Sequence, residues 1–236
     1  MHIEDGILSP AWWLTWYAAT AAFVAPGLRE IRRRIQENLY YKPFLAMVGV
    51  AVFVISSMHM PCPVTGSCSH PCGTPLAAII VGPFATVIIS IIVLFFQAVF
   101  LAHGGITTIG ANTISMGVVG TFVGYGLWKL FRYFKSPVWL AAGIAGFIGD
   151  LAVYLTSSLE LALNLLHGGH LPFFRQWMIF FLGYGPTQLP LAIVEAIFTA
   201  AVLQVMISRR PDLIPDFAPA KSAVPVNPAT ASIGGK

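Results

Sequence analysis

Long apolar runs separated by short polar segments dominate the pattern of this chain. A helix needs about 20 consecutive apolar residues to cross a bilayer, and all but one of the runs approach or exceed that length. Within the runs, apolar and polar residues do not alternate with a period of two, which argues against a transmembrane β-barrel. The pattern predicts an all-α integral membrane protein with seven transmembrane segments, at residues 11–28, 43–60, 75–82, 84–102, 106–131, 138–156 and 177–207.

Basic residues indicate which ends of these segments face the cytoplasm. Short cytoplasmic loops carry an excess of Lys and Arg, and residues 29–34, between the first two segments, are rich in Arg. This places the N-terminus outside, together with the uncharged loop at residues 61–74. The basic residues of 129–135 and 209–210 then fall on the cytoplasmic side. The N-terminal residues and the 61–74 loop are therefore expected to share the outer face.

This topology requires residues 75–102 to cross the membrane twice. Gly82-Pro83 supplies the break, because proline cannot extend the preceding helix and glycine tolerates a sharp turn. The first leg, at residues 75–82, is too short to span alone, so we expect it to be tilted or partly re-entrant and covered by protein. A second interruption is expected at residues 185–190, with the helix restarting at Pro190.

The chain is expected to form a single polytopic membrane domain over residues 1–210. Residues 211–236 are rich in Pro, Ala and Ser without helical periodicity, which predicts a disordered cytoplasmic tail. At the other end, Glu4 and Asp5 stand where a signal peptide carries positive charge, so we interpret the N-terminus as mature.

The amino-acid composition supports the membrane assignment and argues against nucleic acid as a partner. Only 9% of the residues are charged, against roughly 25% in soluble domains. The net charge of +4 comes from basic residues at the ends of apolar runs, which form no surface that could follow a phosphate backbone. Nucleic acid is therefore excluded as a partner, and the lipid bilayer is expected as the surroundings.

A histidine at position two gives the N-terminus a metal-binding chemistry. The amine of Met1, the amide nitrogen of His2 and the His2 imidazole can close adjoining chelate rings around one ion. Such a planar nitrogen set suits nickel(II) or copper(II) and lacks a fourth donor. The structural alternative is that His2 is simply a polar residue on a frayed terminus.

The predicted outer loop holds a second group of metal-binding residue types. Residues 58–73 contain all three cysteines of the chain, two histidines and two methionines. The cysteine spacing matches no closed zinc site, and small thiols also pack well between helices. His70 lies in a loop rich in Gly and Ser that is predicted to face the same side as the terminal amine. It is therefore the candidate for the fourth nitrogen.

Three further residues are candidate auxiliary or second-layer groups. His103 follows an apolar run at a predicted outer helix end, where it either supports a metal or only ends the helix. His59 lies between two methionines, and Cys68 stands two residues before His70. The alternative for His59 is interfacial capping, and for Cys68 it is packing.

Two acidic residues, Asp150 and Glu195, lie inside apolar runs. Ionisable groups are costly there, so each suggests a function. The alternatives are a hydrogen bond to the candidate binding loop or to another helix, and a part in transport.

Four motifs together resemble one known family. They are MHIEDGILSP at the start, VTGSCSHPCGTPLAAIIVGP in the loop, LAHGGITTIGANTISMGVVG near the middle and QLPLAIVEAIFTA late in the chain. In this order, from Met1 to about Arg210, they look like the CbiM/NikM family. Its members are substrate-specificity subunits of energy-coupling-factor (ECF) transporters for cobalt and nickel.

The resemblance implies a fold, a ligand set and partners. The fold would be the six-helix core of this transporter class plus one N-terminal helix. The metal would be transported rather than held as a cofactor, in a square-planar nitrogen site formed by Met1, His2 and His70. The implied partners are a small membrane subunit of NikN/CbiN type, a transmembrane coupling subunit and two ATP-binding subunits, all at the cytoplasmic membrane of a prokaryote.

Some features of this chain differ from the family pattern. Residues 58–62 and Cys72 stand where less metal-binding residue types are expected, which leaves room for an additional ligand or an altered metal preference. The choice between nickel and cobalt stays open.

We therefore predict a transport subunit without enzymatic activity, since no Gly-x-x-x-x-Gly-Lys phosphate loop occurs in the sequence. One alternative is a self-sufficient secondary transporter, for which Asp150 and Glu195 are few ionisable residues. The other is a membrane enzyme with a zinc or thiol site in the cysteine loop, for which no nucleophile and base pair is evident.

Overall fold

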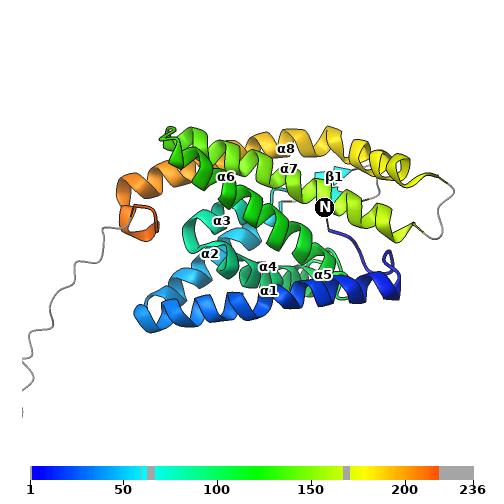
Figure 1. The fold of residues 1–236 in the computed structure, drawn as a ribbon, viewed down its shortest axis with the longest axis horizontal. Helices are drawn as coiled ribbons and strands as arrows, with labels where there is room; N and C mark the ends of the chain where they lie inside the picture. The colour runs from blue at the N-terminus through cyan, green and yellow to red at the C-terminus, as the bar shows by residue number, and fades with distance from the viewer. Residues whose placement is uncertain (1, 59, 63–66, 167–170, 218–236) are drawn as a thin grey trace, which may run out of the picture.

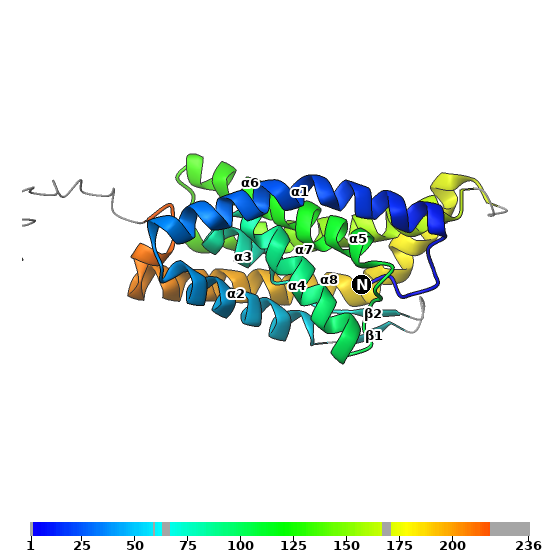
Figure 2. The same ribbon diagram turned by 90° about the horizontal axis from the view of Figure 1, so that it is seen from below.

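A bundle of helices forms the protein, with a short antiparallel hairpin beside one end of it (Figures 1 and 2). The computed structural model describes residues 2–58, 60–62, 67–166 and 171–217, and only the backbone of residues 60–62, 67 and 68. The elements are α1 (Pro10–Glu37), α2 (Tyr41–Ser56), β1 (Met60–Cys62), β2 (Ser67–Ser69), α3 (Thr74–Val81), α4 (Pro83–Phe100), α5 (Ile109–Asn112), the π-helical η1 (Thr113–Gly120), α6 (Thr121–Tyr133), α7 (Val138–Asn164), α8 (Phe173–Arg209) and the 3-10 helix η2 (Pro211–Leu213).

The expected all-α membrane architecture is confirmed in its main features. A helix lies at each of the seven predicted segments. Among the described residues, four helical stretches are long and apolar enough to cross a membrane, and α2 is apolar but shorter. The exact number of crossings therefore remains a prediction. The four stretches are Pro83–Phe100, Ile109–Tyr133, Val138–Asn164 and Phe173–Arg209.

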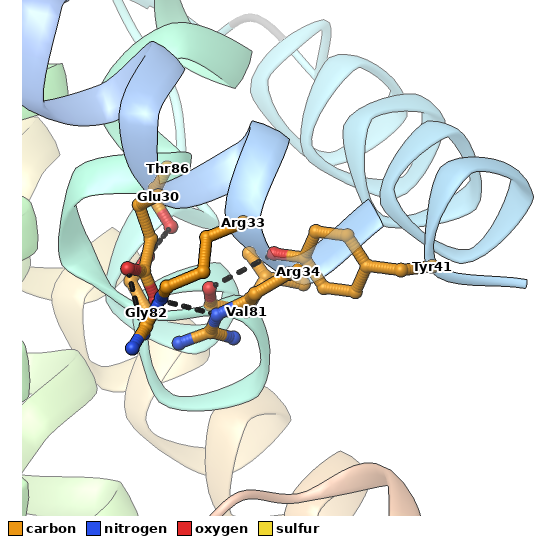
Figure 3. Close-up of polar contacts among 7 residues, drawn as sticks. All are labelled: Glu30, Arg33, Arg34, Tyr41, Val81, Gly82 and Thr86. Atoms are coloured by element: carbon orange, nitrogen blue, oxygen red, sulfur yellow. Dashed lines mark hydrogen bonds and ion pairs between the residues drawn. The ribbon is translucent and has the colours of Figure 1, made fainter. Parts of the chain in front are cut away.

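The predicted break between the third and fourth segments is present. Helix α3 ends at Val81 and α4 begins at Pro83, and Gly82 between them has a φ of +86°. A side chain would be strained in this left-handed conformation, whereas glycine adopts it freely. The hydroxyl of Thr86 donates a hydrogen bond of 2.8 Å to the carbonyl of Gly82, as Figure 3 shows.

The basic end of α1 packs against this break. Glu30 accepts hydrogen bonds from Arg33 and, at 2.6 Å, from Arg34. The Arg34 guanidinium lies 5.6 Å from the centre of the Tyr41 ring, and the Tyr41 hydroxyl donates to the carbonyl of Val81 (Figure 3). These contacts hold the start of α2 and the α3–α4 corner together.

The short helix α3 lies in the interior of the bundle, and all of its residues are buried. A helix that is apolar all round is expected in such a place. Two glycines bring its neighbours close, since a Cβ on Gly124 of α6 or on Gly149 of α7 would lie 2.8 or 2.7 Å from atoms of Pro75. The expectation that protein covers this leg is confirmed.

Helix α8 corrects one expectation, because it runs unbroken through Pro186 and Pro190. We expected an interruption at residues 185–190, by a rule that holds best for helices in water. In a membrane helix, prolines are tolerated when neighbouring groups satisfy the freed backbone atoms.

Residues 211–217 also differ from the expected disordered tail. They fold back against the end of α6, where the indole of Trp128 donates a hydrogen bond of 2.7 Å to Asp216, and Lys129 pairs with the same carboxylate. Ile214 is fully buried. These contacts could not be predicted from the sequence, because Asp216 and its partners are far apart in the chain. Residues 218–236 lie outside the described residues.

The bundle has two distinct ends (Figures 1 and 2). One carries the start of α1, the strands of the hairpin, the C-terminal end of α7 and the start of α8, and the other carries the C-terminal ends of α1, α6 and α8. The predicted cytoplasmic basic residues of 29–34, 129–135 and 209–210 belong to the second end. The segment before α1 turns back into the bundle at the first end, toward the hairpin.

Candidate metal-binding site

Three histidines from distant parts of the chain meet inside the bundle. His2 lies in the segment before α1, His70 follows β2, and His103 lies between α4 and α5. Their exposed fractions are 4%, 1% and 6%. The ring centres are 4.6 Å apart for His2 and His70, 4.4 Å for His2 and His103, and 5.2 Å for His70 and His103.

This geometry is compatible with shared coordination of one ion. One ring nitrogen from each histidine can be chosen so that all three lie within 4.8 Å of one another. Nitrogens on opposite sides of a transition-metal ion are about 4 Å apart, twice a typical metal–nitrogen distance. A small rearrangement of the rings would therefore bring all three onto one centre.

The backbone next to His2 is clamped by buried polar groups. The amide of Ile3 donates a hydrogen bond of 2.8 Å to Oδ1 of Asn112, and Nδ2 of Asn112 donates at 3.1 Å to the carbonyl of Ile3. The hydroxyl of Thr108 donates to the same carbonyl at 2.6 Å. This position of His2 is thus set by side chains from α5 and the loop before it.

Asp5 orders the loop that carries His103. Its carboxylate accepts hydrogen bonds from the amides of Ile106 and Thr107, at 3.1 and 2.9 Å. The N-terminal segment and the His103 loop therefore hold each other in place. Asp5 binds the loop, while Thr108 of the loop and Asn112 of α5 bind Ile3.

Two glycines allow the close approach of these segments. Gly104 has a φ of +74°, and a Cβ there would lie 3.2 Å from Cβ of His2. A Cβ on Gly105 would lie 2.1 Å from Cγ of Asp5. Neither position has room for a side chain unless its neighbours shift.

The tautomer of His70 follows from its own loop. Its Nδ1 lies 3.0 Å from the carbonyl oxygen of Pro71. Since a carbonyl only accepts hydrogen bonds, Nδ1 carries the proton, and Nε2 has the lone pair that a metal requires.

The two buried acids in the apolar runs hold the His70 loop. Glu195 of α8 accepts hydrogen bonds from the backbone amides of Cys72 and Gly73, the latter at 2.8 Å. Asp150 of α7 accepts one from the Cys72 thiol at 3.2 Å. Burial raises the pKa of this thiol well above its usual value, and the two carboxylates add to the shift. Of the alternatives left open by the sequence, the structure shows hydrogen bonds between both acids and the candidate binding loop, and between Asp150 and Gln188 of another helix as well.

The structure brings together some of the predicted site residues and leaves others outside its description. His2, His70 and His103 form the cluster. Met1 and His59 lie outside the described residues, and the backbone of Cys68 lies in β2 while its side chain is not described. That the three histidines bind metal remains a prediction.

Sequence reasoning missed Asn112 and Thr108. Both belong to a motif that supported the family resemblance, and both are buried polar residues around a largely apolar segment. A polar side chain in such a place needs a partner, but no sequence pattern identifies Ile3 as that partner.

Comparisons with known proteins agree with these observations. Residues 2–213 match the CbiM family, described as the cobalt uptake substrate-specific transmembrane region. A relative from Sorangium cellulosum named cobalt transport protein CbiM is 43% identical over 214 residues, covering 91% of this chain and 94% of the relative. A protein of the same name from Geobacter sulfurreducens is 41% identical over 91% of this chain, and the match covers 61% of that longer relative.

Solved structures share the fold. A crystal structure described as a transition metal transporter superposes with a TM-score of 0.79 at 27% identity, covering 88% of this chain and 93% of the other. A structure described as a truncated transition metal transporter gives 0.78 at 27% identity, over 88% of this chain and 99% of the other. The chain therefore belongs to the CbiM family, the substrate-specific transmembrane component of cobalt uptake.

Proposed function

We propose that this chain is the substrate-binding membrane subunit of an ATP-driven ECF uptake transporter, which captures Co²⁺ or Ni²⁺ from the outer face. The observation that carries the proposal is the buried cluster of His2, His70 and His103 at the end of the bundle away from the predicted cytoplasmic basic residues. Nitrogen donors favour late transition metals over magnesium and calcium, which prefer oxygen.

In this proposal four nitrogens surround the ion in a plane. They are the amine of Met1, the amide nitrogen and ring of His2, and Nε2 of His70. His103 is the auxiliary donor, since its ring lies 4.4 Å from that of His2 and can approach the open position above the plane. The clamp of Asn112 on Ile3 favours this arrangement, because it fixes the backbone next to the chelating residue.

Burial of the site bears on how the ion is released. All three rings are largely shielded from water, so a bound ion leaves only when surrounding segments move. We propose that the two ATP-binding subunits drive this movement through a transmembrane coupling subunit, with a small NikN/CbiN-type membrane subunit as a further partner. The complex would lie in the prokaryotic cytoplasmic membrane, with seven segments of this chain crossing it and its N-terminus outside.

The mode of transport is tested by uptake in cells. We expect ⁵⁷Co²⁺ to accumulate in cells that express this chain with its coupling and ATP-binding partners, and accumulation to stop when the ATP-binding subunits carry inactive phosphate loops. Equal uptake by cells expressing this chain alone would instead support the self-sufficient secondary transporter.

The site is tested in the same cells. We expect His70→Ala to abolish uptake at low Co²⁺ concentration while the variant remains in the membrane at the normal level, as measured by immunoblotting. Uptake that persists in His70→Ala with an unchanged concentration dependence would contradict the assignment of this histidine.

A further inference from the structure

A second cluster of metal-binding residue types lies next to the histidines. Cys72 comes from the loop before α3, Asp150 from α7 and Glu195 from α8. One sulfur or oxygen atom of each lies within 4.8 Å of the other two, and all three side chains are buried. Cys72 follows His70 by two residues, so a single loop carries a residue of each cluster.

The positive charge of the N-terminal amine acts on Cys72 and Asp150, but no Lys or Arg of the described residues pairs with either acid of the cluster. Neither Asp150 nor Glu195 takes part in any of the ion pairs that these residues form. Buried carboxylates are costly unless they are paired or coordinate a metal. The hydrogen bonds from the Cys72 thiol and the backbone amides offset part of that cost but bring no positive charge.

An unpartnered polar atom stands beside these carboxylates. Gln188 of α8 is fully buried, and its Nε2 donates a hydrogen bond to Oδ2 of Asp150. The other atom of the same amide, Oε1, is buried without a hydrogen-bond partner. An amide oxygen is an acceptor and a metal ligand, so Oε1 is a further donor that a cation bound beside Asp150 could use.

We propose that Cys72, Asp150 and Glu195 form a second binding site for a late first-row divalent cation, with Oε1 of Gln188 as the fourth donor. One sulfur and three oxygens differ in kind from the nitrogen set of the histidines. Thiolate selects against magnesium and calcium, and the absence of a planar nitrogen set removes the preference for nickel.

Metal binding at this site releases one proton. The cation replaces the hydrogen of the Cys72 thiol, and that proton leaves to solvent. The thiol then no longer donates to Asp150, whose Oδ1 becomes a ligand in place of a hydrogen-bond acceptor. The position beside His70 makes the site a resting place for an ion that leaves the histidines. This role rests on the proposed function, whereas the site itself does not.

Cobalt is the probe that separates the two sites. Titration of Co²⁺ into the purified full-length chain with reduced thiols should show two bound equivalents. Only one of them should produce the near-ultraviolet absorption of a thiolate-to-cobalt charge transfer. We expect Cys72→Ser to remove that absorption and one equivalent. The variant Cys62→Ser is the matched control and should retain both.

A second variant distinguishes loss of the site from a folding defect in Cys72→Ser. Asp150→Asn keeps the size of the side chain and the thiol of Cys72, and should weaken the thiolate-associated equivalent about 10-fold or more, a larger loss than that of the other equivalent. His70→Ala should have the opposite effect, losing the equivalent without thiolate absorption and keeping the other. This pair distinguishes failure of the second site from failure of the proposed function.

Two outcomes would overturn the proposal. One is a wild-type chain that binds Co²⁺ without thiolate absorption, in which case the cluster only anchors the loop. The other is thiolate absorption that survives in Cys72→Ser and disappears in the control variant.

Discussion

The hydrogen bonds between Asn112 and Ile3 lead to a quantitative prediction about metal affinity. In Asn112→Ala, the two buried hydrogen bonds between Asn112 and Ile3 are lost, and the Ile3 amide, in a residue only 3% exposed, has no acceptor. An unsatisfied buried polar group costs about 1–3 kcal/mol. If that energy holds the segment in its binding position, Co²⁺ affinity should fall roughly 5- to 150-fold, since each 1.4 kcal/mol is about a factor of ten.

Asn164 provides a matched control because it makes the same pair of bonds farther from the site. Its Oδ1 accepts from the amide of Ser9 at 2.9 Å, and its Nδ2 donates to the carbonyl of Ile7 at 2.8 Å. These bonds are exposed to solvent, so water can replace them in Asn164→Ala. We expect less than about a threefold change in affinity for this variant.

Isothermal titration calorimetry of Co²⁺ into detergent-purified protein measures both variants, with thermal unfolding without metal as a check on folding. Equal affinities for wild type and Asn112→Ala would refute the reasoning, as would equal losses in Asn112→Ala and Asn164→Ala.

Three further predictions concern the same region. Gly104→Ala should weaken Co²⁺ binding about 10-fold, because a φ of +74° costs a side chain roughly 1–2 kcal/mol and the new Cβ presses on His2. Gly126→Ala is the control, since the space around Gly126 is open, and it should bind Co²⁺ as wild type does. Calorimetry compares the two variants. Asp5→Asn should weaken binding roughly 2- to 10-fold by loosening the loop that begins with His103, and faster hydrogen exchange at the Thr107 amide would accompany the loss. Affinity should fall steadily as the pH is lowered from about 7.5 to 5.5, because imidazole and amine must lose protons to bind, and a flat profile in a competition titration would count against nitrogen ligands.

Much of the fold could be predicted from the sequence because the bilayer limits the choices. Apolar runs have to become helices in lipid, and Gly82-Pro83 marked the α3–α4 break correctly. The prediction was wrong for α8, where Pro186 and Pro190 stay inside one helix, because prolines are better tolerated in membrane helices than in helices in water. The contact of Asp216 with Trp128 depends on long-range packing that no local pattern encodes.

The candidate site could be predicted only in part. The chelating chemistry of the N-terminus and the charge-based topology placed His2 and His70 on one side, and the structure brings their rings together. His103 stayed ambiguous because its distance from His2 depends on how the loop before α5 folds. Asn112 was missed because its partner is a backbone amide 109 positions away.

The central claim is that the terminal amine of Met1 and His2 hold the ion together with His70. It is tested most directly by titrating Co²⁺ and Ni²⁺ into the chain with an authentic Met1 terminus and into the same chain extended by a few residues at its N-terminus. The account predicts tight binding by the authentic chain and its loss in the extended one, because the extension converts the amine into an amide. Equal affinity in both would contradict the account and leave the rings of His2, His70 and His103 as the only described nitrogen donors at the site.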